Sequence, residues 1–324
     1  MRVAAVDCGT NSIRLLIADL NRGIPGDDGH DHASPLTDVT RQMRIVRLGE
    51  GVDRTGRLAA AALDRTMTAL REYAGLIAEA KPAAVRMVAT SATRDAANSQ
   101  EFTDRVLGIL GVAPEVITGD EEAWLSFTGA TRELAGTSLA AEGSCPPPYL
   151  VTDIGGGSTE FVLGGTDGVA GARSVDIGCV RLTERHLHDD PPSAAQIEAT
   201  VRDIDTALGQ AAAAVPAEKA RTLVGLAGSV TTVAAIALGL EEYDSVRIHH
   251  SRISAARVHE IAAGLLAMTR AERAAIPVMH PGRVDVIGAG ALILNRIMTR
   301  FGFAEVLVSE HDILDGIAWS LVPE

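Results

Sequence analysis

Two short segments, far apart in the chain, share one order of residue types. Residues 6–12 read VDCGTNS, and residues 152–160 read TDIGGGSTE. In each, an apolar run ends at an Asp, small residues follow, and a hydroxyl residue precedes a second apolar run. Glycine lets the backbone approach an anion closely, and successive N–H groups in such a turn form a concave anion site. We therefore expect two phosphate-binding turns that face each other across a cleft and hold a polyphosphate from both sides.

Carboxylates at three positions are candidate Mg²⁺ ligands. Asp153 ends a strand beside three glycines and is the first choice, because a hard cation that keeps several waters needs only one or two carboxylates. Glu160 lies at the far end of the return strand and is the second candidate, and Asp7 holds the position matching Asp153 in the first half. Asp7 and Asp153 could also act only as turn-forming residues that cap the glycine turns.

Backbone donors, hydroxyls and arginines are expected to bind the phosphates. The guanidinium of Arg94 could bind phosphate oxygens or form a surface ion pair with Asp95 or Glu101. The strand–turn–helix at Gly228-Ser229 could present its helix N-terminus to a phosphate, or Ser229 could be only an N-cap. The predicted phosphate-binding residues are Gly9, Thr10, Asn11, Ser12, Arg14, Ser91, Thr93, Arg94, Gly155, Gly156, Gly157, Ser158, Thr159, Gly228 and Ser229.

Glu121 is the predicted catalytic partner of Asp153. Removal of a terminal phosphate by water needs neutralised charge, an aligned water and a group that orients or deprotonates it. Glu121 opens a helix after Gly119-Asp120, where a carboxylate also favours the helix dipole without any catalytic role. Glu122 is the alternative, because position along a helix does not choose between neighbours.

The elements that must position these residues repeat along the chain. Strands are expected over 2–7, 13–20, 43–48, 85–90 and 115–118, and helices over 58–80, 99–110 and 121–134. After a loop at 137–148, the strand–turn–strand pattern restarts at Tyr149. Helices over 193–214, 254–267, 284–300 and 312–321 and a strand over 306–308 follow. The repetition predicts a duplicated α/β unit with mixed sheets, since a tight turn joins antiparallel strands.

Composition indicates a folded protein of two domains with an acidic surface. The chain has 324 residues, 47% of them hydrophobic, and a formal net charge of −13. Such a charge argues against broad nucleic-acid binding, which needs a basic surface. A polyanionic substrate would need local neutralisation by Mg²⁺, backbone N–H groups and a few arginines. Lys81 and Lys219 are the only lysines, and we attribute most of the arginines to a general compositional bias.

Cysteine spacing and hydropathy predict a cytoplasmic protein without a membrane segment. Cys8, Cys145 and Cys179 are scattered without metal-ligand spacing, which favours a reducing compartment. Asp7 interrupts the first apolar run too early for a signal peptide. Residues 223–240 carry no charge, but interrupting Gly, Ser and Thr residues favour a buried strand, turn and helix over a membrane helix. The polar segment 21–38, with Asp27, Asp28, His30, Asp31 and His32, is expected to be a solvated loop rather than a metal site.

Five motifs together resemble the exopolyphosphatase and guanosine-pentaphosphate phosphatase family. They lie, in order, at residues 7–16, 89–95, 118–123, 153–160 and 226–232. The resemblance implies an actin/hexokinase-like fold of two ribonuclease-H-like domains, with the active site in the cleft between them and the last helix packed on the first domain. We expect domain I over 1–120 plus 306–324 and domain II over 121–305. The length matches the short two-domain members of this family.

The resemblance also implies roles for single residues. Glu121 matches the position of the family's proposed water-activating glutamate, and Gly228-Ser229 matches a segment that holds a nucleoside in the wider superfamily. Arg181 lies in a matching segment, where it could bind phosphate or pair with Glu184. His311-Asp312 departs from the family, which often has an arginine there, so we assign it no substrate contact. His249-His250 is expected to be structural.

The expected activity is Mg²⁺-dependent hydrolysis of inorganic polyphosphate that releases the terminal orthophosphate. The first alternative is hydrolysis of guanosine pentaphosphate to the tetraphosphate, which would use the same bond-breaking residues. An ATP-dependent kinase on this fold is less favoured because no acceptor motif is present, and a weakly active alarmone or polyphosphate sensor stays open. The expected partners are polyphosphate, guanosine penta- or tetraphosphate and a second copy in a homodimer, with no nucleic acid and no membrane.

Overall fold

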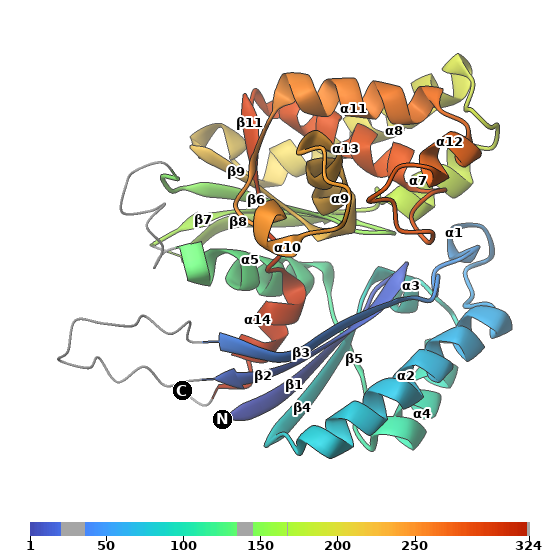
Figure 1. Cartoon of the computed structure of the whole chain (residues 1–324), viewed down its shortest axis with the longest axis vertical. Coiled ribbons are helices and arrows are strands. Elements are labelled where there is room, and N and C mark those ends of the chain that lie inside the picture. Colours follow the sequence, from blue (N-terminus) through green and yellow to red (C-terminus); the bar gives the residue numbers. More distant parts are fainter. Residues whose placement is uncertain (21–35, 135–144, 167, 323–324) are drawn as a thin grey trace.

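Two mixed β-sheets form the framework of the molecule, and the computed structural model describes residues 1–20, 36–134, 145–166 and 168–322 of it. The strand order is β3-β2-β1-β4-β5 in the first sheet and β10-β11-β9-β6-β7-β8 in the second (Figure 1). The predicted α/β architecture of two mixed sheets flanked by helices is confirmed. The strands are β1 (Arg2–Cys8), β2 (Ser12–Leu20), β3 (Leu36–Ile45), β4 (Ala84–Ala89), β5 (Glu115–Val116), β6 (Tyr149–Ile154), β7 (Thr159–Gly165), β8 (Gly168–Val175), β9 (Thr222–Leu226), β10 (Arg252–Ser254) and β11 (Glu305–Val308).

The two sheets share one topology, which confirms the predicted duplication. In each sheet the first two strands are antiparallel, with Asp7 opposite Arg14 in one and Asp153 opposite Glu160 in the other. Strand β4 then runs parallel to β1, and β9 runs parallel to β6. By this correspondence β11 is the counterpart of β5. Strand β11 pairs with β9 in the second sheet, which corrects our placement of residues 306–308 with the first domain.

Helices cover the outer face of each sheet with apolar side chains. The first sheet carries α2 (Ala60–Ala80) and α4 (Ser99–Leu110), and Leu63, Met67 and Phe102 are fully buried there. Short helices α1 (Val52–Thr55) and α3 (Ser91–Arg94) lie at the end of this sheet near the cleft. The second sheet carries α7 (Cys179–His186), α8 (Ala194–Ala214), α9 (Ala227–Ala237), α11 (Ala255–Ala267) and α13 (Ile287–Phe301), with α10 (Ser245–Ile248), α12 (Arg270–Ala274) and the short 3-10 turn Ala217–Lys219 at the periphery.

Several sequence expectations are adjusted by the observed elements. Strand β3 begins at Leu36, within the segment expected to be a loop, while residues 21–35, including the acidic and histidine cluster, lie outside the described residues. The uncharged stretch 223–240 forms β9 and α9, as expected. None of the described helices is long and apolar enough to cross a membrane.

Two crossing helices, α5 (Gly119–Leu134) and α14 (Ile313–Trp319), lie between the sheets, and each packs on the sheet of the other half (Figure 1). Helix α5 follows the first sheet but packs on β6, β7 and β8, whereas α14 follows the second sheet but packs on β1, β2 and β4. Glycines allow the close crossing. A Cβ atom on Gly129 would lie 1.8 Å from the Asp312 carbonyl oxygen, and one on Gly316 would lie 2.0 Å from the Leu125 carbonyl oxygen.

We expect Gly129→Ala to destabilise the fold, because the new methyl group would overlap rigid backbone atoms of α14. The expected loss is about 3 kcal/mol in the free energy of unfolding, measured by urea denaturation. Gly209→Ala in α8 is the matched control, since a Cβ there meets nothing within 4 Å. Removing a helical glycine should stabilise the control by about 0.5–1 kcal/mol. Equal stability of the two variants would contradict the proposed close crossing.

Candidate active site

The two predicted glycine turns have the same backbone geometry. The Gly9 N–H donates to the Ser12 carbonyl at 2.9 Å, and the Gly155 N–H donates to the Ser158 carbonyl at 3.0 Å. One carbonyl oxygen in each turn accepts two hydrogen bonds from a neighbouring segment. The Asn11 carbonyl accepts from the N–H groups of residues 46 and 47, and the Gly156 carbonyl accepts from those of residues 180 and 181. Among the described residues, the N–H groups of Thr10, Asn11, Gly156 and Gly157 donate no backbone hydrogen bond, so they are available to an anion in the cleft.

The turns touch each other across the interface between the two halves. Within the first half, the Thr10 and Ser91 hydroxyl oxygens are 2.8 Å apart. A Cβ on Gly157 would lie 2.7 Å from the Ser91 hydroxyl and 2.8 Å from that of Thr10, so the second turn lies directly against both hydroxyls of the first half. The two segments, distant in sequence, therefore meet at the cleft as expected.

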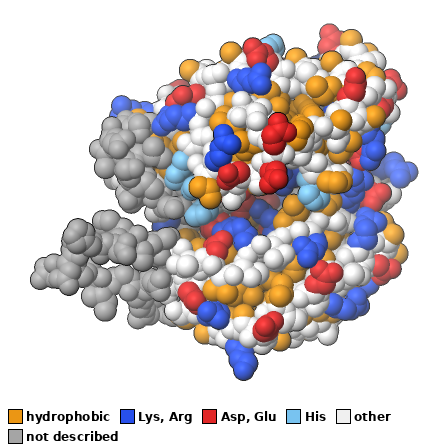
Figure 2. All heavy atoms as spheres, viewed as in Figure 1, with side chains coloured by type: hydrophobic (Ala, Val, Ile, Leu, Met, Phe, Trp, Pro, Cys, Tyr) orange, Lys and Arg blue, Asp and Glu red, His pale blue; other side chains and the backbone are white. Residues whose placement is uncertain are grey.

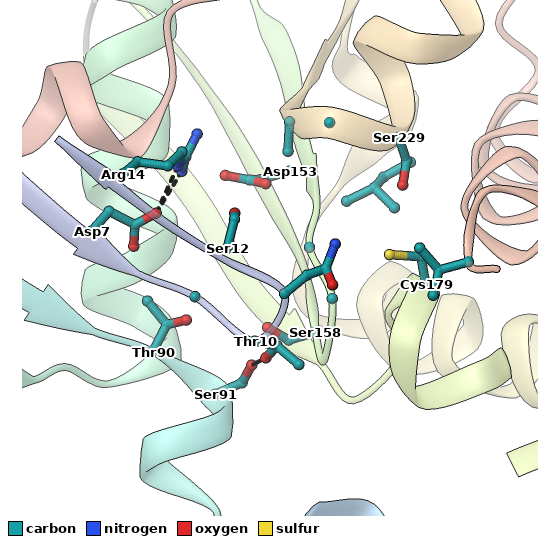
Figure 3. A pocket seen from close by; sticks show the side chains of 18 of the residues that line it. Asp7, Thr10, Ser12, Arg14, Thr90, Ser91, Asp153, Ser158, Cys179 and Ser229 are labelled. Carbon is teal, nitrogen blue, oxygen red and sulfur yellow. Dashed lines mark hydrogen bonds and ion pairs between the residues drawn. The ribbon is translucent and has the colours of Figure 1, made fainter. Parts of the chain in front are cut away.

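A cavity of about 100 Å³ lies between the turns (Figure 3). On the face shown in Figure 2, the surface is hollowed between the two halves of the molecule. Most of the predicted residues line the cavity; Glu121, Thr93, Arg94, Gly157, Thr159 and Glu160 do not. The predicted residues that line it are Asp7, Gly9, Thr10, Asn11, Ser12, Arg14, Ser91, Asp153, Gly155, Gly156, Ser158, Gly228 and Ser229.

Glu122, rather than Glu121, reaches the cavity from α5. The Glu121 carboxylate accepts from Arg86 at 2.7 Å and is 42% exposed, whereas the Glu122 side chain is 10% exposed and lines the cavity. Successive helical residues are rotated by about 100°, so neighbours face different surroundings. Burial raises the pKa of Glu122 to about 8, with the Asp153 charge adding to the rise and Arg94 opposing it. Of the two neighbours, the side chain that faces the cavity is therefore that of the alternative, Glu122, and not that of Glu121.

Arg94 contacts the protein instead of the cavity. Its guanidinium donates to the Ile117 carbonyl at 3.0 Å and to the Glu122 carboxylate at 3.1 Å. Arg94 therefore holds the carboxylate that faces the cavity, and its predicted phosphate contact stays a prediction.

The pairing of Arg94 with Glu122 predicts a shift in the pH profile. In Arg94→Gln the carboxylate loses its cation, so its charged form is less stable and its pKa rises above that of the wild type. For a general base at Glu122 the active form is the carboxylate, so we expect the acid limb of kcat/KM to move to higher pH, with activity recovered on the alkaline side. A uniform rise of KM at every pH would indicate that Arg94 binds phosphate instead.

Arg14 neutralises carboxylates on both sides of it. Its guanidinium donates to Asp7 at 2.9 and 2.6 Å (Figure 3). It also donates to Asp312, which directly precedes α14. Burial raises the pKa of Asp7 although Arg14 lowers it. Burial would also raise the pKa of Asp312, but Arg14 and the Leu314 N–H hold it below its ordinary value. Arg14 therefore lines the cavity as part of a paired cluster, and Asp312, which we had set aside, is its partner and the N-cap of α14.

The corresponding pair in the second half lacks a cation. Glu160 stands opposite Asp153, where the first half has Arg14 opposite Asp7. Asp153 accepts from the Ser126 hydroxyl at 2.7 Å; burial, the Asp312 charge and nearby Asp7 raise its pKa to about 6. Glu160 is fully buried, accepts from the Ser174 hydroxyl at 2.7 Å and does not line the cavity. Burial and the charges of Glu122 and Asp153 raise the pKa of its carboxyl group. The Glu160 carboxylate thus lies behind the cavity that Asp153 lines, and its predicted role as a metal ligand stays a prediction.

Three other predicted residues lie outside the cavity lining. The Thr159 hydroxyl donates to the Ile177 carbonyl at 2.6 Å, Thr93 is buried in α3, and Gly157 provides the close contact between the turns. Arg181 neither lines the cavity nor pairs with Glu184; it donates to the Gly157 carbonyl, Asp53 and Asp95.

Arg283 is the main cavity residue that sequence reasoning missed, along with Thr90 and Cys179. Its guanidinium donates to the Thr232 hydroxyl at 2.9 Å and lies against Gly228, where a Cβ would be 2.5 Å from a guanidinium nitrogen. It precedes α13 in the turn after His280-Pro281-Gly282, a turn signal that could have singled it out. Treating the arginines as a compositional bias hid it.

A second cavity of about 430 Å³ adjoins the first and shares Arg14, Met43, Ala227, Gly228 and Arg283 with it. Its wall is partly apolar, with Val278, Met279 and Leu314, and the Tyr243 hydroxyl donates to Glu310 at 2.5 Å beside it. The connected cavities can therefore hold a molecule that extends beyond one phosphate.

The donor chemistry of the site suits a hard cation. The buried Asp7 Oδ1 has no hydrogen-bond partner among the described atoms, and the charge of Asp153 is opposed by no cross-strand cation. Within the described residues no group of three or more His, Cys, Asp or Glu side chains could hold a metal ion. Mg²⁺, which needs only one or two carboxylates and takes its other ligands from water and phosphate, fits this set.

Comparisons with known proteins agree on one family. The model of the Ppx/GppA phosphatase family matches residues 27–324. Exopolyphosphatase 2 of Mycobacterium tuberculosis is 51% identical over 99% of this chain and 98% of that protein. The crystal structure of an exopolyphosphatase-like protein is 45% identical with a TM-score of 0.90 and covers 98% of each chain. The Aquifex aeolicus Ppx/GppA family member is 30% identical with a TM-score of 0.75, covering 99% of this chain and 97% of that chain.

Proposed function

This chain belongs to the Ppx/GppA phosphatase family, and we propose that it is an exopolyphosphatase that releases the terminal orthophosphate of inorganic polyphosphate. The observation that carries the proposal is the position of Glu122. A buried carboxylate with a raised pKa lies in one cavity with two glycine turns that can bind phosphate. A general base and oriented donors in one enclosed site are what attack of water on a phosphoanhydride requires.

Each part of the site has a distinct role in this proposal. The N–H groups of the two turns and the Ser12 and Ser158 hydroxyls bind the terminal phosphate, and Arg283 binds phosphates farther along the chain. Glu122 accepts a proton from the attacking water, whose oxygen bonds to the terminal phosphorus. The bond from phosphorus to the bridging oxygen breaks, and that oxygen stays on the shortened polyphosphate.

Asp153 and Asp7 are the residues that would hold Mg²⁺ in this proposal. Both are buried, both line the cavity, and their charges interact with each other. When bound, Mg²⁺ neutralises charge on the phosphate oxygens, which an acidic protein otherwise repels.

A guanosine pentaphosphate 5′-phosphohydrolase is the second candidate, and the adjoining cavity favours it. A partly apolar volume of about 430 Å³ beside the phosphate site is large enough for a nucleoside, and Gly228 lies on the boundary between the two cavities. We further propose a homodimer that acts in the cytoplasm.

Phosphate release by the purified protein tests these proposals. We expect Mg²⁺-dependent release from tripolyphosphate and long-chain polyphosphate, with removal of one orthophosphate at a time. Faster release from guanosine pentaphosphate would favour the second candidate. Tight alarmone binding without release would favour a sensor, and transfer of phosphate to a small acceptor a kinase; either result would overturn the hydrolase assignment.

A further inference from the structure

Helix α7 forms the support of the second glycine turn. The N–H groups of Cys179 and Val180 donate to the carbonyls of Gly155 and Gly156 at 3.0 and 2.9 Å. A Cβ on Gly178 would lie 2.4 Å from the Gly156 carbonyl group, so the first turn of α7 is in direct contact with the loop. Any displacement of α7 would therefore move the second phosphate-binding turn.

One side chain of α7 joins this turn to the opposite half of the molecule. The Arg181 guanidinium donates to the Gly157 carbonyl at 2.6 Å, to Asp53 in α1 at 2.6 Å and to Asp95 at the end of α3 at 2.5 Å. The side chains of Arg181, Asp53 and Asp95 are 13%, 22% and 32% exposed, so water screens these pairs only partly. The Asp95 N–H also donates to the Ser91 carbonyl, and the Ser91 hydroxyl in turn contacts the Thr10 hydroxyl of the first turn.

Two further contacts surround this arginine. Arg185, one turn along α7, donates to Asp53 at 2.8 Å, and the Glu184 carboxylate accepts from the Gly51 N–H at 3.1 Å. These bonds cross from the second half of the molecule to the first, close to the edge of the catalytic cavity. Arg181 alone among them also bonds the phosphate-binding turn itself.

We infer that Arg181 is a positioning residue that couples closure of the two halves to the shape of the phosphate site. Its guanidinium serves three acceptors on three segments, which a lysine ammonium cannot match in the same planar geometry. Without it, the two halves separate more often and the turns meet in a smaller fraction of molecules. The apparent affinity for substrate falls by that fraction, while molecules that are saturated still react at the normal rate. The inference rests on the proposed hydrolase activity.

The test combines kinetics with hydrogen exchange at Gly51, whose N–H donates to Glu184 of the other half and would lose that bond if the halves separated. We expect Arg181→Gln to raise the KM for tripolyphosphate about tenfold with little change in kcat, and to speed exchange at Gly51. Asp95→Asn should also raise KM and speed exchange at Gly51. In the double variant, the change in binding free energy should be smaller than the sum of the two single changes. Arg202→Gln on the exposed face of α8 is the control and should change neither quantity.

Unchanged Gly51 exchange in Arg181→Gln, or a lower kcat at an unchanged KM, would overturn the inference. If Arg181→Gln does not fold, Asp95→Asn carries the same test from the other side of the contact. If the wild type releases no phosphate, the proposed function is refuted. Comparing Gly51 exchange in the wild type and Arg181→Gln without substrate would still test whether Arg181 holds the two halves together.

Discussion

Glu122→Gln should lower the rate of phosphate release about 10³-fold, while Glu121→Gln should stay within about threefold of the wild type. The two residues are neighbours on α5 with the same side chain, but only Glu122 lines the cavity. The amide has nearly the shape of the carboxylate and cannot accept the proton of the attacking water. Glu121 instead forms a partly exposed ion pair with Arg86, and such pairs contribute little.

Single-turnover release from tripolyphosphate, with binding measured by calorimetry, separates loss of the base from loss of affinity. Glu122→Gln should bind about as well as the wild type, because the amide keeps the shape of the carboxyl group and adds no charge beside the anionic substrate. It should also remove the acid limb of the pH profile, which we expect near the Glu122 pKa of about 8. Turnover lost in Glu121→Gln and kept in Glu122→Gln would reverse the assignment.

Asp153→Asn should remove both activity and the stabilisation of the fold by Mg²⁺. The carboxylate is buried without a cross-strand cation, so it is the main negative charge available to a metal. At a Mg²⁺ concentration one hundred times the dissociation constant, a bound ion adds about 2.7 kcal/mol to the unfolding free energy. We expect that gain in thermal melts of the wild type, and none in Asp153→Asn.

In the metal-free protein, the contribution of Asp153 to folding stability should change with pH in the opposite direction from that of an ordinary salt-bridged carboxylate. The pKa of Asp153 is raised from 3.8 to about 6 in the folded state, so folding takes up a proton between these values. Its stabilising contribution is present below 3.8 and lost as pH rises through about 6, and Asp153→Asn should weaken this dependence. Glu160→Gln is the comparison: it should raise metal-free stability yet keep the Mg²⁺ response. Loss of that response in Glu160→Gln alone would restore Glu160 as a ligand.

Local residue order was enough to predict the two turns, their flanking strands and the duplicated architecture. An Asp, small residues and a hydroxyl between apolar runs constrain the backbone within a few residues, and both turns formed as expected at Gly9 and Gly155. Alternation of strands and helices likewise predicted two mixed sheets. These features depend on neighbours in sequence, for which backbone preferences are strong.

Contacts between distant segments determined which side chains occupy the cavity. The rotation of α5 about its axis depends on packing of Ala123 and Phe127 against the second sheet and Leu125 against α14, and that rotation turns Glu122 inward and Glu121 outward. Arg94 meets Glu122, Arg14 meets Asp312 and Arg283 meets Gly228 across separations that no local pattern encodes. Strand β11 similarly joined the second sheet through pairing with β9. A side chain acquires its partner and its pKa from such packing, because charge and burial act through space rather than along the chain.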